Sequence, residues 1–255
     1  MIKDWKWLVV IAWLSSGVWA GFAREYAEQW YDLLLIARNK KKTDTFIKYL
    51  HILYPNIKIS YKIFDVLKKN ELNELEKEII NIKNIKKIIN CLAYTSHKET
   101  IKNKRKKWED LITLHDLAAI HISQIAVKIM KREKQWSIIH VSSLSSLFAI
   151  ANDPISATSK IFLNDFSNTF NQIHNKNIYI QTLCPKFTDT YFKKQKQQTF
   201  KDKALCVHKI IKKSILCSKK WFILCVPKFT NKTILTIYNI LPKTWSYKIF
   251  KLFLN

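Results

Sequence analysis

Glycine is nearly absent from this chain: among 255 residues, only Gly17 and Gly21 are glycine. The usual share in proteins is about 7%. Proteins that alternate strands and helices normally place glycine in their tight turns, because it adopts backbone angles that other residues avoid. If this chain is such a protein, either its turns are built from other residues, or some positions written otherwise are glycine in nature.

Paired cysteines are also missing. The five cysteines are odd in number and form no C-x-x-C pair, so the sequence predicts neither a disulfide framework nor a zinc site. A reducing, cytoplasmic location fits this pattern. None has an evident base partner, so each is interpreted as a small apolar filler rather than a nucleophile. The cysteines are Cys91, Cys184, Cys206, Cys217 and Cys225.

Arginine is scarce although the formal charge is +25. Such a charge favours nucleic acid, an anionic membrane or an anionic cofactor as a partner. Arginine is the usual reader of bases and phosphates, so a surface dominated by lysine does not predict a nucleic-acid partner. A nucleic-acid or membrane-surface protein is a candidate class supported by charge alone. The four arginines are Arg24, Arg38, Arg105 and Arg132.

The N-terminal stretch has the clearest structural pattern. An apolar run from Trp7 to Ala12 precedes a small polar turn, an amphipathic segment and a second apolar run from Tyr31 to Ala37. Strand, turn, helix and strand within about 30 residues form one βαβ unit. Continuous apolar strands are typical of a parallel sheet covered on both faces. With 48% hydrophobic residues, the chain can form one α/β domain with a sizeable core.

A signal peptide or signal anchor is the alternative interpretation, since Lys3 and Lys6 precede the apolar run. The charged residues Arg24, Glu25 and Glu28 and a second apolar strand are not typical of the segment after a cleavage site. The βαβ interpretation is therefore preferred.

The first turn of a βαβ unit can hold a dinucleotide pyrophosphate, because backbone N–H groups and the positive helix end point there. This turn resembles that of the short-chain dehydrogenase/reductases, Thr-Gly-x-x-x-Gly-x-Gly. Ala12 stands for the threonine, and Trp13, Gly17 and Trp19 stand for the glycines. An indole there should fill volume that the pyrophosphate needs. The residues implied to bind the cofactor here are Ser15, Ser16, Gly17 and Val18.

The resemblance runs from Trp7 to Thr190 and implies a Rossmann-like, doubly wound parallel sheet in a single α/β domain. Residues 1–95 would form the cofactor-binding half, 96–195 the catalytic half, and 196–255 a basic C-terminal segment on the substrate side. In the family, the end of the second strand selects the cofactor. Arg38 stands there and no acid does, which implies NADP(H) rather than NAD(H). A solvated basic turn is the alternative interpretation.

The other implied cofactor contacts follow three further predicted strands, Ile57 to Phe64, Ile85 to Ile89 and Ile178 to Leu183. In chain order they are Asp65 and Val66 at the adenine, Asn90 and Ala93 in the family's Asn-Asn-Ala-Gly, and Pro185 and Thr190 in its Pro-Gly-x-x-x-Thr. For the segment from Pro185 to Thr190, a turn after a buried strand is the alternative and needs no cofactor.

The implied catalytic residues rest on the same resemblance. Ser143 takes the place of the serine that orients the substrate, and Lys160 that of the lysine in Tyr-x-x-x-Lys, which holds the nicotinamide ribose. Ser156 replaces the tyrosine of that motif. His115 occupies the position of an asparagine that holds a water for proton relay, although a polar helix residue facing its neighbours is an alternative.

The missing tyrosine matters for the chemistry. Reduction of a ketone needs an acid for the developing alkoxide, and a tyrosine beside a lysine cation supplies one near neutral pH. The hydroxyl of Ser156 is a far weaker acid. No tyrosine lies between Tyr94 and Tyr179. We expect a loss of about 10²- to 10⁴-fold or more in rate.

Four tryptophans fall where the family has glycine: Trp13, Trp19, Trp30 and Trp136. One hypothesis is that their codons specify glycine in the organism. A drifting, non-functional chain is the competing hypothesis, and Ser156 supports it because recoding does not explain that residue.

The C-terminal part gives weaker signals. A basic stretch from Tyr191 to Lys203 is interpreted as a substrate lid or a loop, and a helix is predicted around Ala204 to Cys217. An aromatic, lysine-bearing segment from Thr233 to Leu254 either lies on a membrane surface or closes the substrate side.

Taken together, the residues and the resemblance predict an impaired NADP(H)-dependent oxidoreductase that acts on a small carbonyl or alcohol substrate. A catalytically inactive binding or scaffold protein with the same fold is the alternative. A homo-oligomer is compatible with the resemblance, and no metal site is predicted.

Overall fold

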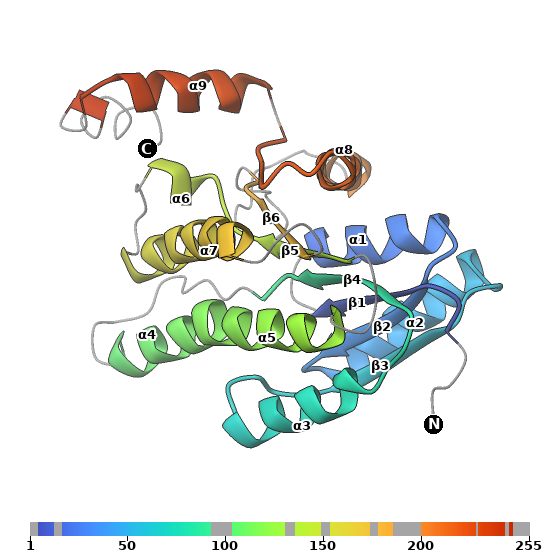
Figure 1. Ribbon diagram of the computed structural model, residues 1–255. Helices are drawn as coiled ribbons and strands as arrows, with labels where there is room; N and C mark the ends of the chain where they lie inside the picture. The colour runs from blue at the N-terminus through green and yellow to red at the C-terminus, as the bar shows by residue number, and fades with distance from the viewer. Residues whose placement is uncertain are drawn as a thin grey trace.

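The computed structural model describes residues 5–12, 17–92, 104–130, 136–148, 154–173, 178–185, 200–227, 229–242 and 245–246. Strands and helices alternate along these residues (Figure 1). The strands are β1 Leu8–Ala12, β2 Asp32–Ala37, β3 Ile59–Ile63, β4 Ile85–Asn90, β5 Trp136–Val141, β6 Ile178–Leu183 and β7 Leu224–Cys225. The helices are α1 Gly17–Glu28, α2 Lys40–Leu53, α3 Lys69–Ile80, α4 Lys104–Ile112, the π-helical turn η2 Thr113–Leu117, α5 Ala118–Met130, α6 Ser145–Phe148, α7 Pro154–Ile173, α8 Phe200–Lys219 and α9 Phe229–Ile240.

The strands form one sheet in the order β3-β2-β1-β4-β5-β6-β7, and every neighbouring pair is parallel. The chain runs outward from β1 to β3, crosses back to place β4 beside β1, and continues outward to β7. The predicted doubly wound parallel sheet in a single domain is confirmed. Ligands of such sheets bind where the strand order reverses, at the carboxyl ends of β1 and β4.

Helices cover both faces of the sheet, so β1 is buried along its whole length. Val10 packs with residues of α3 and α5 on one face, whereas Val9 and Ile11 pack with α1 and α8 on the other. Figure 1 shows α1 and α8 on one side of the strands and α3 and α5 on the other. This double burial is the physical reason why β1 and β2 read as unbroken apolar runs.

Gly21 allows α1 and α8 to pack closely. A Cβ atom at this position would lie 2.7 Å from Cγ1 of Val207 and 3.1 Å from Cγ1 of Ile211. One turn further along α1, the Glu25 carboxylate lies beside the His208 ring of α8, with 3.3 Å between Oε2 and Nδ1. The scarce glycine is thus used where two helix backbones approach.

The predicted elements match the observed ones in type and order, and the differences lie at their ends. The sequence pattern predicts a long helix from Trp108 to about Met130; the observed helical segment begins earlier, at Lys104, and contains the π-helical turn η2. The basic stretch interpreted as a lid or loop enters α8 at Phe200, so the loop interpretation is wrong for residues 200–203. The aromatic C-terminal segment includes most of α9, which begins at Phe229. Within the described ranges, no helix is long and apolar enough to cross a membrane.

Candidate functional site

The pyrophosphate turn is described from Gly17 onward. Gly17 begins α1, and Val18 beside it is buried. The Trp19 indole is buried against Phe46 of α2, with 4.6 Å between the ring centroids. It therefore fills core volume between two helices, and among the described residues its N–H has no hydrogen-bond partner. Ser15, Ser16 and Trp13 lie outside the described residues.

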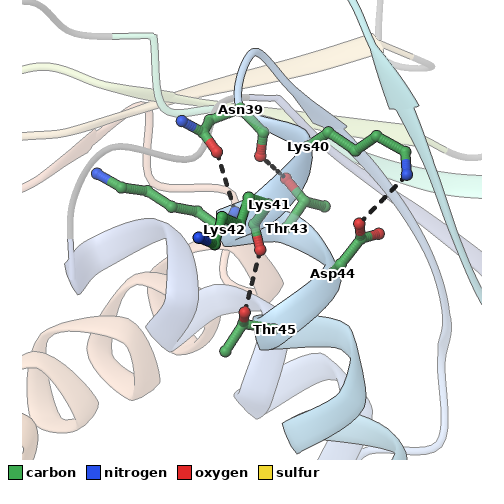
Figure 2. A network of polar contacts seen from close by, with 7 residues as sticks. All are labelled: Asn39, Lys40, Lys41, Lys42, Thr43, Asp44 and Thr45. Atoms are coloured by element: carbon green, nitrogen blue, oxygen red, sulfur yellow. Dashed lines mark hydrogen bonds and ion pairs between the residues drawn. The ribbon is translucent and has the colours of Figure 1, made fainter.

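The sequence pattern predicts a helix from Thr43 to Leu53 after β2, and the observed helix α2 begins three residues earlier, at Lys40. The side chain of Asn39 accepts a hydrogen bond from the backbone N–H of Lys42 at 3.0 Å, and its carbonyl accepts one from the Thr43 hydroxyl at 2.7 Å (Figure 2). This N-cap draws Lys40, Lys41 and Lys42 into the first turn of the helix. Exposed cations and the positive helix end therefore lie next to Arg38.

Arg38 and Asp65 line the same hollow, which has a volume of about 410 Å³ and lies at the carboxyl ends of β2 and β3. Lys68, Glu71 and Glu74 of the next segment also line it. Lys68 is paired with Glu71 at 2.7 Å. The lining thus combines two basic side chains with three acidic ones. The two glutamates were not predicted as site residues.

Two predicted cofactor residues in this region are held by other contacts. The Asp65 carboxylate accepts a hydrogen bond from the N–H of Leu67 at 3.2 Å. Val66 is buried in the core with α3 and α5. The structure thus brings Asp65 to the hollow and places the side chain of Val66 beneath it.

Asn90 ends β4 and forms a buried polar chain. Its Oδ1 accepts a hydrogen bond from the N–H of Leu92 at 3.0 Å, so its Nδ2 is the donor toward His140 Nδ1, also at 3.0 Å. His140 Nδ1 must therefore be the acceptor, which leaves the proton on Nε2, 3.3 Å from Ser123 Oγ. Burial lowers the pKa of His140 to about 3, so the ring is neutral.

Lys160 of α7 lies at the carboxyl ends of β4 and β5. Its Nζ donates to the carbonyls of Leu92 at 3.3 Å and Val141 at 3.2 Å, and the side chain is buried. Burial lowers the pKa of Lys160 to about 8, an effect that the nearby Asp116 partly opposes. Two neutral carbonyl partners offset only part of the cost of removing an ammonium from water.

The serines after β5 fasten α7 to the sheet. Ser142 Oγ donates to the carbonyl of Lys160 at 3.0 Å. Ser143 is partly exposed, and its carbonyl accepts hydrogen bonds from Ser146, whose N–H lies at 3.2 Å and whose hydroxyl lies at 2.5 Å. Ser143 is thus held beside the segment that anchors Lys160.

Ser156 lies in the first turn of α7, one turn before Lys160 and therefore on the same side of the helix. His115 reaches this helix through Ser159, whose hydroxyl lies 2.8 Å from Nδ1. Burial and the charge of Lys160 lower the pKa of His115, so the ring is neutral. The structure brings Ser156, Lys160 and His115 to one helix, with His115 facing its neighbours in the core.

Asp116 was not predicted as a site residue. Burial raises the pKa of its carboxyl to about 7, although the Lys160 charge lowers it. Its Oδ1 is buried and has no hydrogen-bond partner in the described part of the chain. The residue lies in the π-helical turn η2, a feature often found at functional sites.

The remaining predicted positions add little. Pro185 is buried after β6, and its carbonyl accepts the N–H of Leu144 at 2.9 Å. Burial raises the pKa of Cys91, and that of Cys184 to about 12, as expected of apolar fillers. Ala93 and Thr190 lie outside the described residues.

A profile of the short chain dehydrogenase family matches residues 7–201. This range includes the turn before α1, Lys160 and all strands from β1 to β6. The chain belongs to the short-chain dehydrogenase family. Members of this family bind nicotinamide cofactors and small-molecule substrates.

The chain is also similar to curated relatives and solved structures, with low sequence identity to each. Very-long-chain 3-oxoacyl-CoA reductase-A of Danio rerio is 24% identical over 200 residues, which cover 76% of this chain and 61% of that protein. The human inactive hydroxysteroid dehydrogenase-like protein 1 is 22% identical over 193 residues, covering 74% and 58%. A short-chain dehydrogenase from Sphingobium yanoikuyae in complex with NADPH is 17% identical, has a TM-score of 0.73, and matches over 92% of this chain and 96% of that one. The chain thus spans about half to three fifths of its first curated relatives.

Proposed function

We propose that this short-chain dehydrogenase is an NADP(H)-dependent oxidoreductase that acts on a carbonyl or alcohol with a weakened proton-transfer step. The observation that carries the proposal is the position of Lys160. It is a buried cation at the carboxyl ends of β4 and β5, beside the point where the strand order reverses, and its ammonium bonds two main-chain carbonyls. Lysine is almost never fully buried unless it is paired, and the hydrogen-bond partners of Lys160 among the described residues are neutral carbonyls.

The residues fit a nicotinamide dinucleotide at both of its ends. The hollow beside Arg38 offers about 410 Å³ for an adenosine. An ammonium has three donors; two of those on Lys160 bond the carbonyls, and the third, which has no partner in the described part of the chain, would bond a ribose hydroxyl. When bound, the cofactor supplies or accepts the hydride.

Three side chains have roles in binding and reaction. Ser143 orients the substrate oxygen, and Lys160 holds the nicotinamide ribose. Ser156 occupies the position of the proton-donating tyrosine, but a serine hydroxyl is a far weaker acid than a phenol. This difference accounts for the expected loss of about 10²- to 10⁴-fold in rate.

The preference for NADP(H) rests on charge. Arg38 and the exposed Lys41 and Lys42 at the start of α2 can attract a 2′-phosphate. Asp65, Glu71 and Glu74 in the same hollow oppose this attraction, and Glu71 is paired with Lys68. The NADPH in the Sphingobium yanoikuyae structure supports the same cofactor at the level of the fold.

Fluorescence titration with NADPH and NADH tests the preference. Replacing Arg38 by alanine removes charge-assisted hydrogen bonds and should weaken NADPH binding by about 10- to 100-fold, with little change for NADH. Lys77→Ala, at an exposed site on α3, is the control and should change neither. Equal losses for both cofactors in the Arg38 variant would contradict a 2′-phosphate site.

A catalytically inactive binding protein is the second candidate, favoured by Ser156 in place of the tyrosine and by the relative named as inactive. The two candidates separate in single-turnover experiments with bound NADPH and a panel of ketones. Slow hydride transfer supports the enzyme, whereas tight cofactor binding without any transfer supports the binding protein.

The halves suggested by the sequence, 1–95 and 96–195, remain part of the proposal, as does a homo-oligomer in the cytoplasm. The C-terminal segment 196–255 is proposed to close the substrate side or to rest on a membrane surface. Exposed Ile237, Ile240 and Trp245 support the surface role. Co-sedimentation with anionic vesicles tests it, and a protein that stays in the supernatant at low salt would exclude it.

A further inference from the structure

Helix α1 ends in a Schellman motif. The N–H of Trp30 donates to the carbonyl of Ala27, and the N–H of Tyr31 donates to that of Tyr26, both at 3.0 Å. This pair of hydrogen bonds places Trp30 at the position just past the helix end. Glycine dominates that position because the backbone there is left-handed.

Helix α8 ends in the same way. The N–H of Trp221 donates to the carbonyl of Ser218, and that of Phe222 donates to the carbonyl of Cys217, both at 3.1 Å. Trp221 therefore holds the position in α8 that Trp30 holds in α1. The two helices are far apart in the sequence, so tryptophan occurs at this position in two independent places.

Both tryptophans adopt the left-handed conformation, with φ of 62° at Trp30 and 59° at Trp221. In this conformation the Cβ atom of an L-residue lies too close to a carbonyl oxygen. Across the described ranges, the only other residue with positive φ is Asn84, and asparagine tolerates it. Tryptophan accounts for nine of 255 residues, yet it occupies both remaining left-handed positions.

The side chains do not offset this strain by burial. The Trp30 side chain is 63% exposed and that of Trp221 is 54% exposed. Trp221 makes an edge contact with Tyr179, with 5.1 Å between ring centroids. Both indoles are thus more than half exposed, whereas the backbone conformation at both positions favours glycine.

We propose that positions 30 and 221 are glycine in the natural protein, because their codons are read as glycine by the organism that makes it. Drift would place many residue types at such positions, not tryptophan twice. Trp136 stands where the family has glycine, but it begins β5 and its backbone makes no such demand.

Codons read as glycine would also change the cofactor turn, and this step rests on the proposed function. Glycine at positions 13 and 19 would complete the pattern Gly-x-x-x-Gly-x-Gly around Gly17. It would also remove the buried Trp19 indole, whose N–H lacks a partner among the described residues. Backbone N–H groups at the start of α1 could then approach a pyrophosphate.

Peptide mass spectrometry of the protein from its native source tests the proposal. Glycine masses are expected at positions 30 and 221, and tryptophan at 108, which lies inside α4 where glycine is unfavourable. Tryptophan at 30 and 221 would overturn the proposal. Glycine there, together with a failure to bind NADPH, would leave the proposal intact and remove the proposed function instead.

Thermal unfolding of recombinant variants gives a second test. Trp30→Gly and Trp221→Gly should each raise Tm by about 2–6 °C, since they relieve a left-handed side chain. Trp30→Ala is the matched control, because it removes the indole but keeps the Cβ, and it should give no comparable increase. An equal increase for alanine and glycine would overturn the strain argument.

Discussion

Replacing Lys160 by methionine should change how stability depends on pH. The pKa of Lys160 is about 8 in the folded protein against an ordinary 10.5. Between these values the unfolded chain holds a proton that the folded chain has released, so the wild-type protein gains stability as pH rises. The difference of roughly 2.5 units corresponds to about 3 kcal/mol.

The methionine variant lacks this gain. It also leaves the carbonyls of Leu92 and Val141 without the ammonium donor, which lowers stability by a pH-independent amount of about 1–3 kcal/mol for each unpaired group. The informative quantity is therefore the change with pH of the difference in unfolding free energy between wild type and variant. The unfolding free energy of wild type minus that of Lys160→Met should increase by about 3 kcal/mol between about pH 7 and about pH 10.5.

Urea unfolding at several pH values measures this difference. Lys77→Met, at an exposed position of α3, is the matched control, and its difference from wild type should stay constant. A constant difference for Lys160→Met as well would refute the account of a buried, desolvated lysine at the centre of the site.

Three further outcomes are expected. Ser156→Tyr places a phenol one turn before Lys160 and should raise the rate of carbonyl reduction by about 10²- to 10⁴-fold in a stopped-flow assay with NADPH, whereas a phenylalanine there should not. Gly21→Ala should lower the unfolding free energy by about 1–3 kcal/mol, because its Cβ would lie 2.7 Å from Val207, and Val207→Ala in the same chain should restore much of the loss in urea unfolding. Asp116→Asn should move the lower limit of the pH window of the Lys160 effect downward, since Asp116 raises the pKa of that lysine in the folded protein, and an unmoved lower limit would show that the two side chains do not interact.

The fold could be predicted from local patterns because each strand at the centre of the sheet is buried on both faces. The residues of β1 and β2 are apolar almost throughout, and a parallel sheet covered by helices is the environment in a globular domain that favours this pattern. The start of α2 was missed, because the N-cap bond of Asn39 extends the helix over three lysines that look like a loop.

The site was only partly predictable. Lys160 and Ser156 were named through the resemblance to the family's Tyr-x-x-x-Lys motif, and the structure places them one turn apart on α7; their roles stay a proposal. His140 and Asp116 were missed, because their importance comes from partners on other elements: Asn90 for the first and the charge of Lys160 for the second. The π-helical turn that carries Asp116 leaves no recognisable signal in the residue pattern.

The strain at Trp30 and Trp221 could not be derived from the sequence alone either. Resemblance to the family singles out Trp30, whereas Trp221 is revealed only by the hydrogen bonds that end α8. Backbone handedness depends on where a helix stops, and the sequence defined that point only approximately.

Binding of NADPH to the protein isolated from its native source tests the central claim most directly. The account predicts saturable binding by fluorescence, tighter than that of NADH. Absence of binding at high micromolar NADPH, in a protein shown to carry glycine at positions 13 and 19, would contradict it.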